Sequence, residues 1–285
     1  MHGIERVGVI GSGQMGGGIA QIAATNGFET VVYDLDSAAL ARCKSLHEKL
    51  LTRAIEKGRM TDAQVKDTKA RLTYSDRIAE IHASDIVIEA VVERASVKKE
   101  IFKSLAGSVS YKTILASNTS SISITDLATS VGDKADRFIG MHFFNPVPVM
   151  KLVEVINGLA TSKETTERVL ALSAAMGKTA VPANDRAGFV SNRILMPMIN
   201  EAFYTWMEGV AEPEHIDEIM KLGMAHPMGP LRLADFIGLD TCVHIMEVLA
   251  DGLNNPRYRA CPLLKQLVTA GRLGDKTKHG VFKYD

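Results

Sequence analysis

A glycine-rich turn between two short apolar runs limits what this chain can fold into more than any other feature of the sequence. Residues 6–34 read RVGVIGSGQMGGGIAQIAATNGFETVVYD, which predicts a strand, a tight turn, a helix and a second strand that ends at Asp34. In such a unit Gly11 permits the turn, Gly13 lets the backbone approach a pyrophosphate, and Gly16 lets the helix pack closely on the strand. A glycine turn without a ligand is the alternative, but the strand, helix and terminal acid in register favour a dinucleotide-binding unit.

The same stretch predicts which dinucleotide binds. The helix after the turn presents free N–H groups and the positive end of its dipole to phosphates. The residues of this turn that we expect to bind the cofactor are Gly11, Ser12, Gly13, Gln14, Met15 and Gly16. The carboxylate of Asp34 can accept hydrogen bonds from both hydroxyls of an adenosine ribose, and its charge would repel a 2′-phosphate. We therefore expect NAD as the cofactor rather than NADP.

Short β-branched runs alternate with helical patterns along the first two thirds of the chain. The runs lie at 7–10, 30–33, 86–91, 113–116, 138–141, 152–156 and 179–181. Alternation of this kind predicts an α/β fold with a doubly wound, mostly parallel sheet of the Rossmann type. The run at 152–156 follows its predecessor after a short proline-containing link, so it could be antiparallel, because a parallel crossover needs a dozen or more residues.

Two departures from a plain alternation set the domain organisation. Residues 37–58 and 62–71 predict a helical hairpin inserted into the sheet domain, an arm at about 37–71. After Arg186 the sequence becomes helical and rich in apolar residues, with helices expected from 188, over 213–222 and over about 231–252, and no strand after 181. We therefore expect a nucleotide-binding domain over 1–186 and an all-α domain over 187–285.

The composition fits a soluble globular protein and gives no sign of a nucleic-acid or membrane partner. The 285 residues have a formal net charge of zero, and 46% are hydrophobic, so neither nucleic acid nor a membrane is an expected partner. The three cysteines are far apart and predict free thiols in a reducing compartment. With no secretory signal before the first strand, we expect a cytoplasmic protein. The histidines show no metal-binding spacing, so no metal site is expected.

The candidate chemistry lies in residues 141–155, MHFFNPVPVMKLVEV. His142 falls at the end of a predicted strand, where doubly wound sheets bind ligands. Glu154 stands among apolar residues, and a partly buried carboxylate needs a partner, for which an imidazole is well suited. Such a pair can act as a base and the carboxylate that orients it. From position alone, a buried pair that only holds the loop is an equally good interpretation.

Three further groups of polar residues have two interpretations each. Residues 116–121 (ASNTSS) predict either a turn or the wall of a hydrogen-bonding pocket. Asn192 is either a lone polar residue on a helix or a side chain that points across the domain interface. Lys49, Arg53 and Lys57 share one face of the arm, which is either a solvated stripe or a phosphate-binding surface.

Taken together, the motifs resemble those of the short-chain L-3-hydroxyacyl-CoA dehydrogenase family, and most of all the bacterial 3-hydroxybutyryl-CoA dehydrogenases. The segments that carry the resemblance are VIGSGQMGGGIAQ, DIVIEAVVE, ASNTSSISIT, GMHFFNPVPVMKLVEVI, GFVSNRI and HPMGPLRLADFIGLD. They span almost the whole chain in the expected order, and the motif around His142 is long and specific.

The resemblance implies roles for individual residues. His142 would be the general base and Glu154 its partner. Ser121 and Asn192 would hydrogen-bond the substrate near the reacting hydroxyl and the thioester. The residues that would contact NAD beyond the glycine turn are Asp34, Glu93, Lys98, Ser121, Asn145 and Lys276.

The implied reaction belongs to fatty acid metabolism: (S)-3-hydroxyacyl-CoA, in particular 3-hydroxybutyryl-CoA, and 3-ketoacyl-CoA, in particular acetoacetyl-CoA, would interconvert by hydride transfer with NAD and a His–Glu proton relay. Arg53 and Lys57 match the positions where the family binds the CoA phosphates. Two alternatives are a sugar-acid dehydrogenase of the gulonate type and a non-catalytic, crystallin-like NAD-binding protein. The basic arm argues against the first, and the intact catalytic set argues against the second.

The helical domain and its end carry two further expectations. Its large apolar side chains exceed what a domain of about 100 residues can bury alone, so we expect a homodimer formed mainly through this domain. The chain has Ala187, Ser191 and Asp275 where many family members have proline, valine and arginine. The negative charge of Asp275 could weaken the cofactor contact of its neighbour Lys276, so these departures leave the affinity for the cofactor open.

Overall fold

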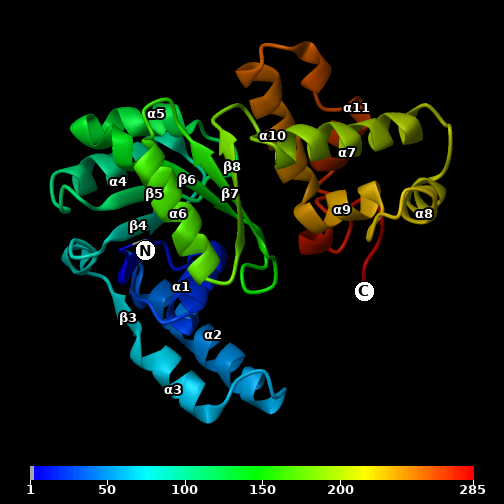
Figure 1. Cartoon of the computed structure of the whole chain (residues 1–285). Helices are drawn as coiled ribbons and strands as arrows, with labels where there is room; N and C mark the ends of the chain where they lie inside the picture. The colour runs from blue at the N-terminus through cyan, green and yellow to red at the C-terminus, as the bar shows by residue number, and fades with distance from the viewer. Residues whose placement is uncertain (1–2) are drawn as a thin grey trace. The chain divides into compact units, whose positions relative to one another are not determined.

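The computed structural model describes residues 3–285, which form two compact units that divide between Asp185 and Arg186 (Figure 1). The first unit contains the sheet and the second is built of helices. This confirms the predicted fold class, a Rossmann-type sheet with a helical insertion followed by an all-α unit. In the described part of the chain, no helix combines the length and the apolar character that crossing a membrane requires.

The sheet of the first unit has eight strands in the order β3-β2-β1-β4-β5-β6-β7-β8. Their bounds are β1 (Arg6–Ile10), β2 (Glu29–Tyr33), β3 (Leu72–Ser75), β4 (Ile86–Glu89), β5 (Ile114–Ser117), β6 (Phe138–Phe143), β7 (Leu152–Asn157) and β8 (Thr179–Asn184). Among these described strands, only β6 and β7 pair antiparallel, as the short link between them predicts. The chain runs outward from β1 to β3 and then returns to β4, so the strand order reverses beside β1.

The helices of the first unit cover both faces of the sheet and form the arm. They are α1 (Gln14–Thr25), α2 (Ser37–Glu56), α3 (Asp62–Ala70), α4 (Ala95–Ala106), α5 (Ile124–Ala128) and α6 (Lys163–Ala175), with short 3₁₀ helices at Ile78–Ile81 and Thr129–Arg137. The arm, α2 and α3, extends away from the sheet in Figure 1. Thr61 and Gln64 form a reciprocal capping box at the start of α3, which explains why the helix begins there.

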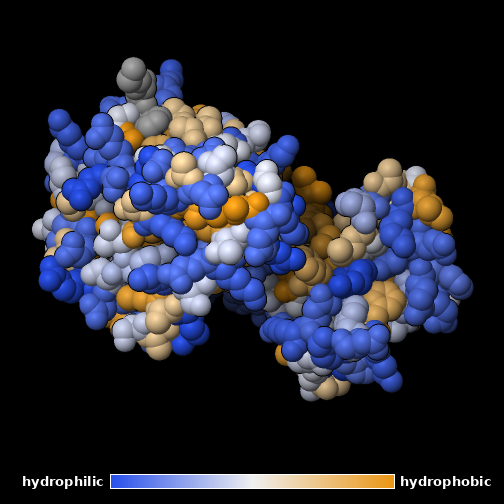
Figure 2. All heavy atoms as spheres, turned by 90° about the horizontal axis from the view of Figure 1, so that it is seen from below, coloured by the Kyte–Doolittle hydropathy of each residue, from blue (hydrophilic) through white to orange (hydrophobic). Residues whose placement is uncertain are grey.

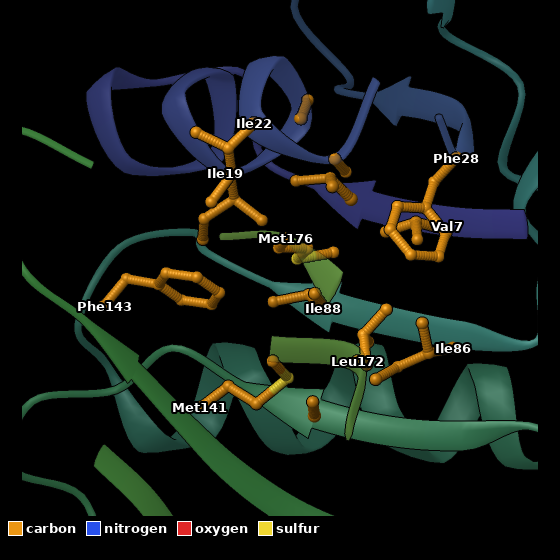
Figure 3. Close-up of a cluster of buried hydrophobic side chains, with 14 of the residues drawn as sticks. Val7, Ile19, Ile22, Phe28, Ile86, Ile88, Met141, Phe143, Leu172 and Met176 are labelled. Carbon is orange, nitrogen blue, oxygen red and sulfur yellow. The ribbon is translucent and has the colours of Figure 1, made fainter. Parts of the chain in front are cut away.

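One face of the sheet packs on α1 and α6 through a continuous apolar core (Figure 3). Ile19 from α1 and Leu172 from α6 are fully buried there, and Val153 and Val155 of β7 belong to the same cluster. Shortening Ile19 or Leu172 to alanine would typically cost about 2–5 kcal/mol of stability. Because alternate residues of a strand point to opposite faces, the side chain between Val153 and Val155 points away from this core.

The second unit contains five helices within its described residues, and two predictions there were wrong. The helices are α7 (Ser191–Met207), α8 (Pro213–Gly223), α9 (Pro230–Ile237), α10 (Leu239–Gly252) and α11 (Pro262–Thr269), with 3₁₀ helices at Pro256–Tyr258 and Asp275–Thr277. The single helix expected over about 231–252 is broken at Gly238, whose φ of 103° lies outside the helical range. The helix α11 was not predicted, because its eight residues give too short an apolar pattern.

The strand predictions erred at two places. The strand β3 was missed, because its sequence LTYS is only half-buried at the edge of the sheet and lacks a strong apolar run. The last strand, β8, continues past Val181 through Pro182 to Asn184. A proline there is compatible with its place at the sheet edge.

Candidate active site

The glycine turn between β1 and α1 leaves room for a ligand at one of its three glycines. A side chain at Gly11, where φ is 100°, would come within 2.6 Å of the carbonyl oxygen of Ala90, and one at Gly16 would come within 1.9 Å of the carbonyl oxygen of Gly11. Nothing lies within 4 Å of the corresponding position at Gly13. Gly13 is also the N-cap residue of α1, and it has no side chain with which to cap the helix. The open space beside Gly13 therefore adjoins the free N–H groups at the start of α1. This arrangement suits a pyrophosphate.

Asp34 stands beside this turn at the end of β2. One of its carboxylate oxygens accepts hydrogen bonds from the backbone N–H and the hydroxyl of Ser12, both at 2.7 Å. The other oxygen accepts from the backbone N–H of Asp36 at 3.1 Å. These bonds hold the carboxylate at the edge of the glycine turn, where it can reach an adenosine ribose. The residues present therefore fit NAD.

His142 and Glu154 lie directly opposite each other on β6 and β7. The imidazole Nδ1 and a carboxylate oxygen are 2.7 Å apart, and both residues are buried, with 7% and 4% of their surface exposed. An ionised carboxylate can only accept, so Nδ1 carries the proton that it donates to Glu154. The Phe144 ring lies 4.6 Å from the imidazole, centroid to centroid. The antiparallel register thus creates a desolvated acid–base pair.

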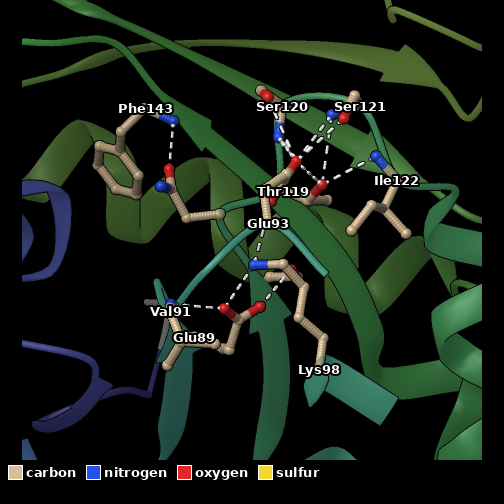
Figure 4. A network of polar contacts seen from close by, with 11 residues as sticks. Glu89, Val91, Glu93, Lys98, Thr119, Ser120, Ser121, Ile122 and Phe143 are labelled. Carbon is tan, nitrogen blue, oxygen red and sulfur yellow. Dashed lines mark hydrogen bonds and ion pairs between the residues drawn. The ribbon is translucent and has the colours of Figure 1, made fainter. Parts of the chain in front are cut away.

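A buried ion cluster joins the end of β4 to α4 (Figure 4). The ammonium of Lys98 lies 2.6 Å from a carboxylate oxygen of Glu89 and 3.2 Å from one of Glu93. Glu89 also accepts hydrogen bonds from the backbone N–H of Val91 at 2.7 Å and from the hydroxyl of Ser117 at 2.6 Å. Because Lys98 is only 1% exposed, its side chain lies within this cluster and not on the surface.

Glu93 continues the network to the turn that contains Ser121. One of its oxygens accepts from the hydroxyl of Thr119 at 2.5 Å, from the backbone N–H of Ser120 at 2.8 Å, and from both the N–H and the hydroxyl of Ser121 at 3.2 Å. Burial alone would raise the pKa of Glu93, but the charge of Lys98 and these hydrogen bonds outweigh it and hold the pKa below its ordinary value. Glu93 therefore fixes the 119–121 turn as an anion.

The loop between β6 and β7 is tied to the glycine turn and to β8. The side-chain amide of Gln14 donates to the side-chain oxygen of Asn145 at 2.9 Å. The ammonium of Lys178 donates to the carbonyl oxygens of Val147 and Met150 at 2.5 and 2.7 Å. Burial lowers the pKa of Lys178. These contacts hold the loop that joins the strands of His142 and Glu154.

A cavity of about 490 Å³ opens between α1, α2 and this loop. Gly13 and Gly17 line it from α1, Leu46 lines it from α2, and Val147 lines it from the loop. Lys49, Arg53 and Lys57 are exposed on or next to α2. A larger cavity of about 1040 Å³ lies at the amino ends of the strands, and its described lining includes none of the predicted site residues. The smaller cavity is the one that adjoins the candidate chemistry.

The remaining predicted residues belong to the second unit. Asn192 lies in the first turn of α7 and is 8% exposed. The ammonium of Lys276 contacts both carboxylate oxygens of Asp240 at 2.5 Å. Asp275 forms a two-bond pair with the guanidinium of Arg232, at 2.9 and 3.1 Å. Asp275 is thus paired with Arg232, while its neighbour Lys276 is paired with Asp240.

Sequence reasoning missed Glu89 and Lys178, which support the site from behind. Ser117 and Asn118 were noted only as part of the 116–121 segment, without a partner for either. The side-chain oxygen of Asn118 accepts from the backbone N–H of Phe143 at 2.9 Å, which joins the 118–121 turn to the strand of His142. The available signal for Glu89 was a glutamate in an otherwise apolar strand, IVIE, because a carboxylate in such a place needs a cation nearby.

Known proteins of one family match this chain over almost its whole length. Residues 6–186 match the family model described as the NAD binding domain of 3-hydroxyacyl-CoA dehydrogenase, and residues 188–284 match that of its C-terminal domain. A probable 3-hydroxybutyryl-CoA dehydrogenase of Bacillus subtilis is 56% identical over 283 residues, which cover 99% of this chain and 98% of that protein. The human mitochondrial hydroxyacyl-coenzyme A dehydrogenase is 42% identical over 288 residues, covering 99% of this chain and 91% of that protein.

A solved structure gives the same result for the fold. The crystal structure of (S)-3-hydroxybutyryl-CoA dehydrogenase from Ralstonia eutropha superposes with a TM-score of 0.96 at 50% identity, covering 99% of each chain.

Proposed function

This chain belongs to the 3-hydroxyacyl-CoA dehydrogenase family, and we propose that it interconverts (S)-3-hydroxybutyryl-CoA and acetoacetyl-CoA, using NAD. The observation that carries the proposal is the buried pair of His142 and Glu154, whose atoms are 2.7 Å apart. The names of the relatives support the four-carbon substrate. An enzyme of this family needs a group that takes a proton from the C3 hydroxyl, and this pair can do so.

The proton step follows from the geometry of the pair. Because Nδ1 donates to Glu154, the nitrogen that exchanges a proton with the substrate is Nε2 of His142. In oxidation Nε2 removes the proton of the C3 hydroxyl while the hydrogen on C3 leaves with its electron pair, and the C3–O bond becomes a carbonyl. NAD, when bound, supplies the nicotinamide that accepts this hydride. In reduction the imidazolium returns the proton to the ketone oxygen, and the charge of Glu154 stabilises that imidazolium.

Other residues would place the reacting molecules. We assign Ser121 and Asn192 to hydrogen bonds with the substrate, and Ser121 is held by Glu93 at 3.2 Å. The glycine turn and Asp34 would hold the adenosine half of NAD. Glu93, Lys98, Asn145 and Lys276 complete the proposed cofactor set. Since Lys98 is buried, it would act through Glu93.

The arm would hold the CoA part of the substrate. Arg53 and Lys57 are exposed cations at and just after the end of α2, where they can reach phosphates. The cavity of about 490 Å³ runs beside the same helix and offers an apolar path toward the loop after His142. This arrangement supports a substrate that carries CoA.

A coupled assay tests the proposal. Oxidation of NADH would be followed with acetoacetyl-CoA and longer 3-ketoacyl-CoAs, and reduction of NAD would be followed with gulonate. We expect turnover of acetoacetyl-CoA, which the matched variant His142→Gln should lack. Turnover of gulonate alone would overturn the CoA substrate, and binding of NAD without any turnover would indicate a crystallin-like protein.

We also propose a cytoplasmic homodimer. The three cysteines are buried free thiols, which suits a reducing compartment. Met196, Phe203 and Ile245, three of the large apolar side chains of this domain, belong to the core of the second unit, so fewer apolar side chains are left for an interface than expected. Ile194 and Leu222 remain 68% and 79% exposed. The face seen in Figure 2 is mostly hydrophilic, with apolar side chains scattered among the polar ones. Light scattering at micromolar concentration should give twice the chain mass, and a monomer would reject the dimer.

A further inference from the structure

The ion cluster at the end of β4 does not balance its own charge. Two carboxylates, Glu89 and Glu93, surround one ammonium, that of Lys98. Glu89 is 0% exposed, and its remaining partners, the N–H of Val91 and the hydroxyl of Ser117, are neutral donors. The hydrogen bonds that Glu93 accepts from the 119–121 turn also come from neutral groups. The cluster therefore holds one more negative charge than positive charge (Figure 4).

The surplus charge is concentrated on Glu93. Lys98 lies closer to Glu89, at 2.6 Å, than to Glu93, at 3.2 Å, so it neutralises Glu89 more completely. The Glu93 side chain is 29% exposed, whereas those of Lys98 and Glu89 are 1% and 0% exposed. Glu93 is thus the member of the cluster that reaches the surface, and its low pKa keeps it ionised at neutral pH.

The strand order places this surplus on the nicotinamide side of the proposed cofactor site. In doubly wound sheets a dinucleotide lies across the point where the strand order reverses, with one mononucleotide on each half. Here the reversal is beside β1, and Asp34, the proposed ribose ligand, ends β2 on one side. The other mononucleotide then belongs on the side of β4 and β5. Glu93 follows β4, and the 119–121 turn that it holds follows β5.

We propose that the excess negative charge of the Glu89–Lys98–Glu93 cluster makes the site discriminate between the two redox forms of the cofactor, with Glu89 setting that charge. The nicotinamide ring of NAD⁺ is cationic and that of NADH is neutral, so only the first is attracted to the surplus. The inference rests on the proposed cofactor site but not on the identity of the acyl substrate. Glu89 is fully buried and paired with Lys98, so it is a positioning residue that acts through Lys98.

The test variant is Glu89→Gln, which removes one charge with little change in shape. The amide oxygen can still accept from Val91 and Lys98, and the amide nitrogen can donate to the oxygen of Ser117. Lys98 would then neutralise Glu93. We expect the ratio Kd(NADH)/Kd(NAD⁺), measured by calorimetry without acyl-CoA, to fall about three- to tenfold. It falls because the cationic ring of NAD⁺ loses an attraction that solvent partly screens, whereas the neutral ring of NADH loses none. The matched control is Glu80→Gln, which removes a carboxylate paired with exposed Arg77 and should leave the ratio unchanged.

A second variant guards against loss of folding. Glu93→Gln removes the surplus directly at a partly exposed side chain and should lower the same ratio, whatever its effect on the two separate affinities. A merely structural role would weaken both forms by the same factor, so an unchanged ratio in Glu93→Gln and in folded Glu89→Gln would overturn the inference. If the enzyme proves inactive on 3-hydroxybutyryl-CoA, the proposed substrate fails, but the binding ratio still decides this inference.

Discussion

Replacing Glu154 by glutamine should lower kcat by about three orders of magnitude without unfolding the protein. The substitution keeps the size of a side chain that is 4% exposed and replaces a charged partner of the imidazole by a neutral one. At an effective dielectric constant of about 20, opposite charges about 4 Å apart attract by about 4 kcal/mol. That attraction exists only while His142 carries the proton, and about 4 kcal/mol corresponds to about 10³ in rate.

The assay is steady-state oxidation of 3-hydroxybutyryl-CoA with NAD, the direction in which His142 gains its proton, together with calorimetric titration of NAD. We expect His142→Gln to lose at least as much, about 10³-fold or more in kcat, within the range of about 10²–10⁴ that a positioned acid–base group contributes. The double variant should be scarcely worse than His142→Gln alone, because both side chains serve one proton transfer. NAD should bind to all three variants as it does to the unmodified protein.

The pH dependence of kcat in the two reaction directions tests the assignment of the base more strictly than the loss of kcat does. Ketone reduction requires protonated His142 and alcohol oxidation requires the neutral ring, so kcat for reduction should fall as pH rises while kcat for oxidation rises. If His142→Gln kept the original kcat, or if both directions responded to pH alike, the assignment of the base would be wrong. Additive losses in the double variant would show instead that Glu154 acts on something other than His142.

Three other properties can be checked independently. NAD should give a much higher kcat/KM than NADP, and Asp34→Asn should reduce this difference, because the repulsion of a 2′-phosphate is lost. Equal kcat/KM values for the two cofactors in the unmodified protein would refute the assignment of Asp34 to the adenosine ribose. Arg53→Ala and Lys57→Ala should raise KM for acetoacetyl-CoA with kcat little changed, less so at high salt, and the arm control Lys66→Ala should change neither. Burial lowers the pKa of His47 in the folded state, so folding stability should decline as pH falls below about 6.5, the ordinary value in the unfolded chain. In chemical denaturation, His47→Asn should show a weaker loss between pH 7 and 5.5, and an equal loss would contradict this reasoning.

The sequence predicted the parts of the site that depend on local pattern. The glycine turn, its helix and Asp34 lie within one βαβ unit, so their spacing along the chain already determines their spacing in the fold. The pairing of His142 with Glu154 was predicted, but its role was left between catalysis and holding the loop, because position alone does not distinguish the two. The structure provides the register of the two strands through the antiparallel ladder of β6 and β7.

The parts that the sequence could not predict depend on contacts between distant elements. Lys98 has the same charge and helix position as many solvated lysines, and only the fold shows that it lies between Glu89 and Glu93. Lys178 precedes an edge strand, yet it binds carbonyl oxygens of a loop about 30 residues earlier. The break at Gly238 was missed for another reason, since the apolar pattern continues on both sides of it and a glycine within a helix is a tolerable cost.

The single antiparallel pair in the described sheet is what makes the proposed relay possible. In a parallel pair a crossover would have to separate the two strands, and the residues facing each other would be far apart in sequence. Here Met141 and Phe143 point into the core with α1 and α6, as do Val153 and Val155, so His142 and Glu154 share the opposite face. A slip of one residue would send Glu154 into the apolar core and leave His142 opposite a valine. The ties from Gln14 to Asn145, and from Lys178 to the carbonyls of Val147 and Met150, therefore protect the register as well as the loop. Together with the apolar alternation of both strands, they keep the imidazole of His142 and the carboxylate of Glu154 on one face of the sheet.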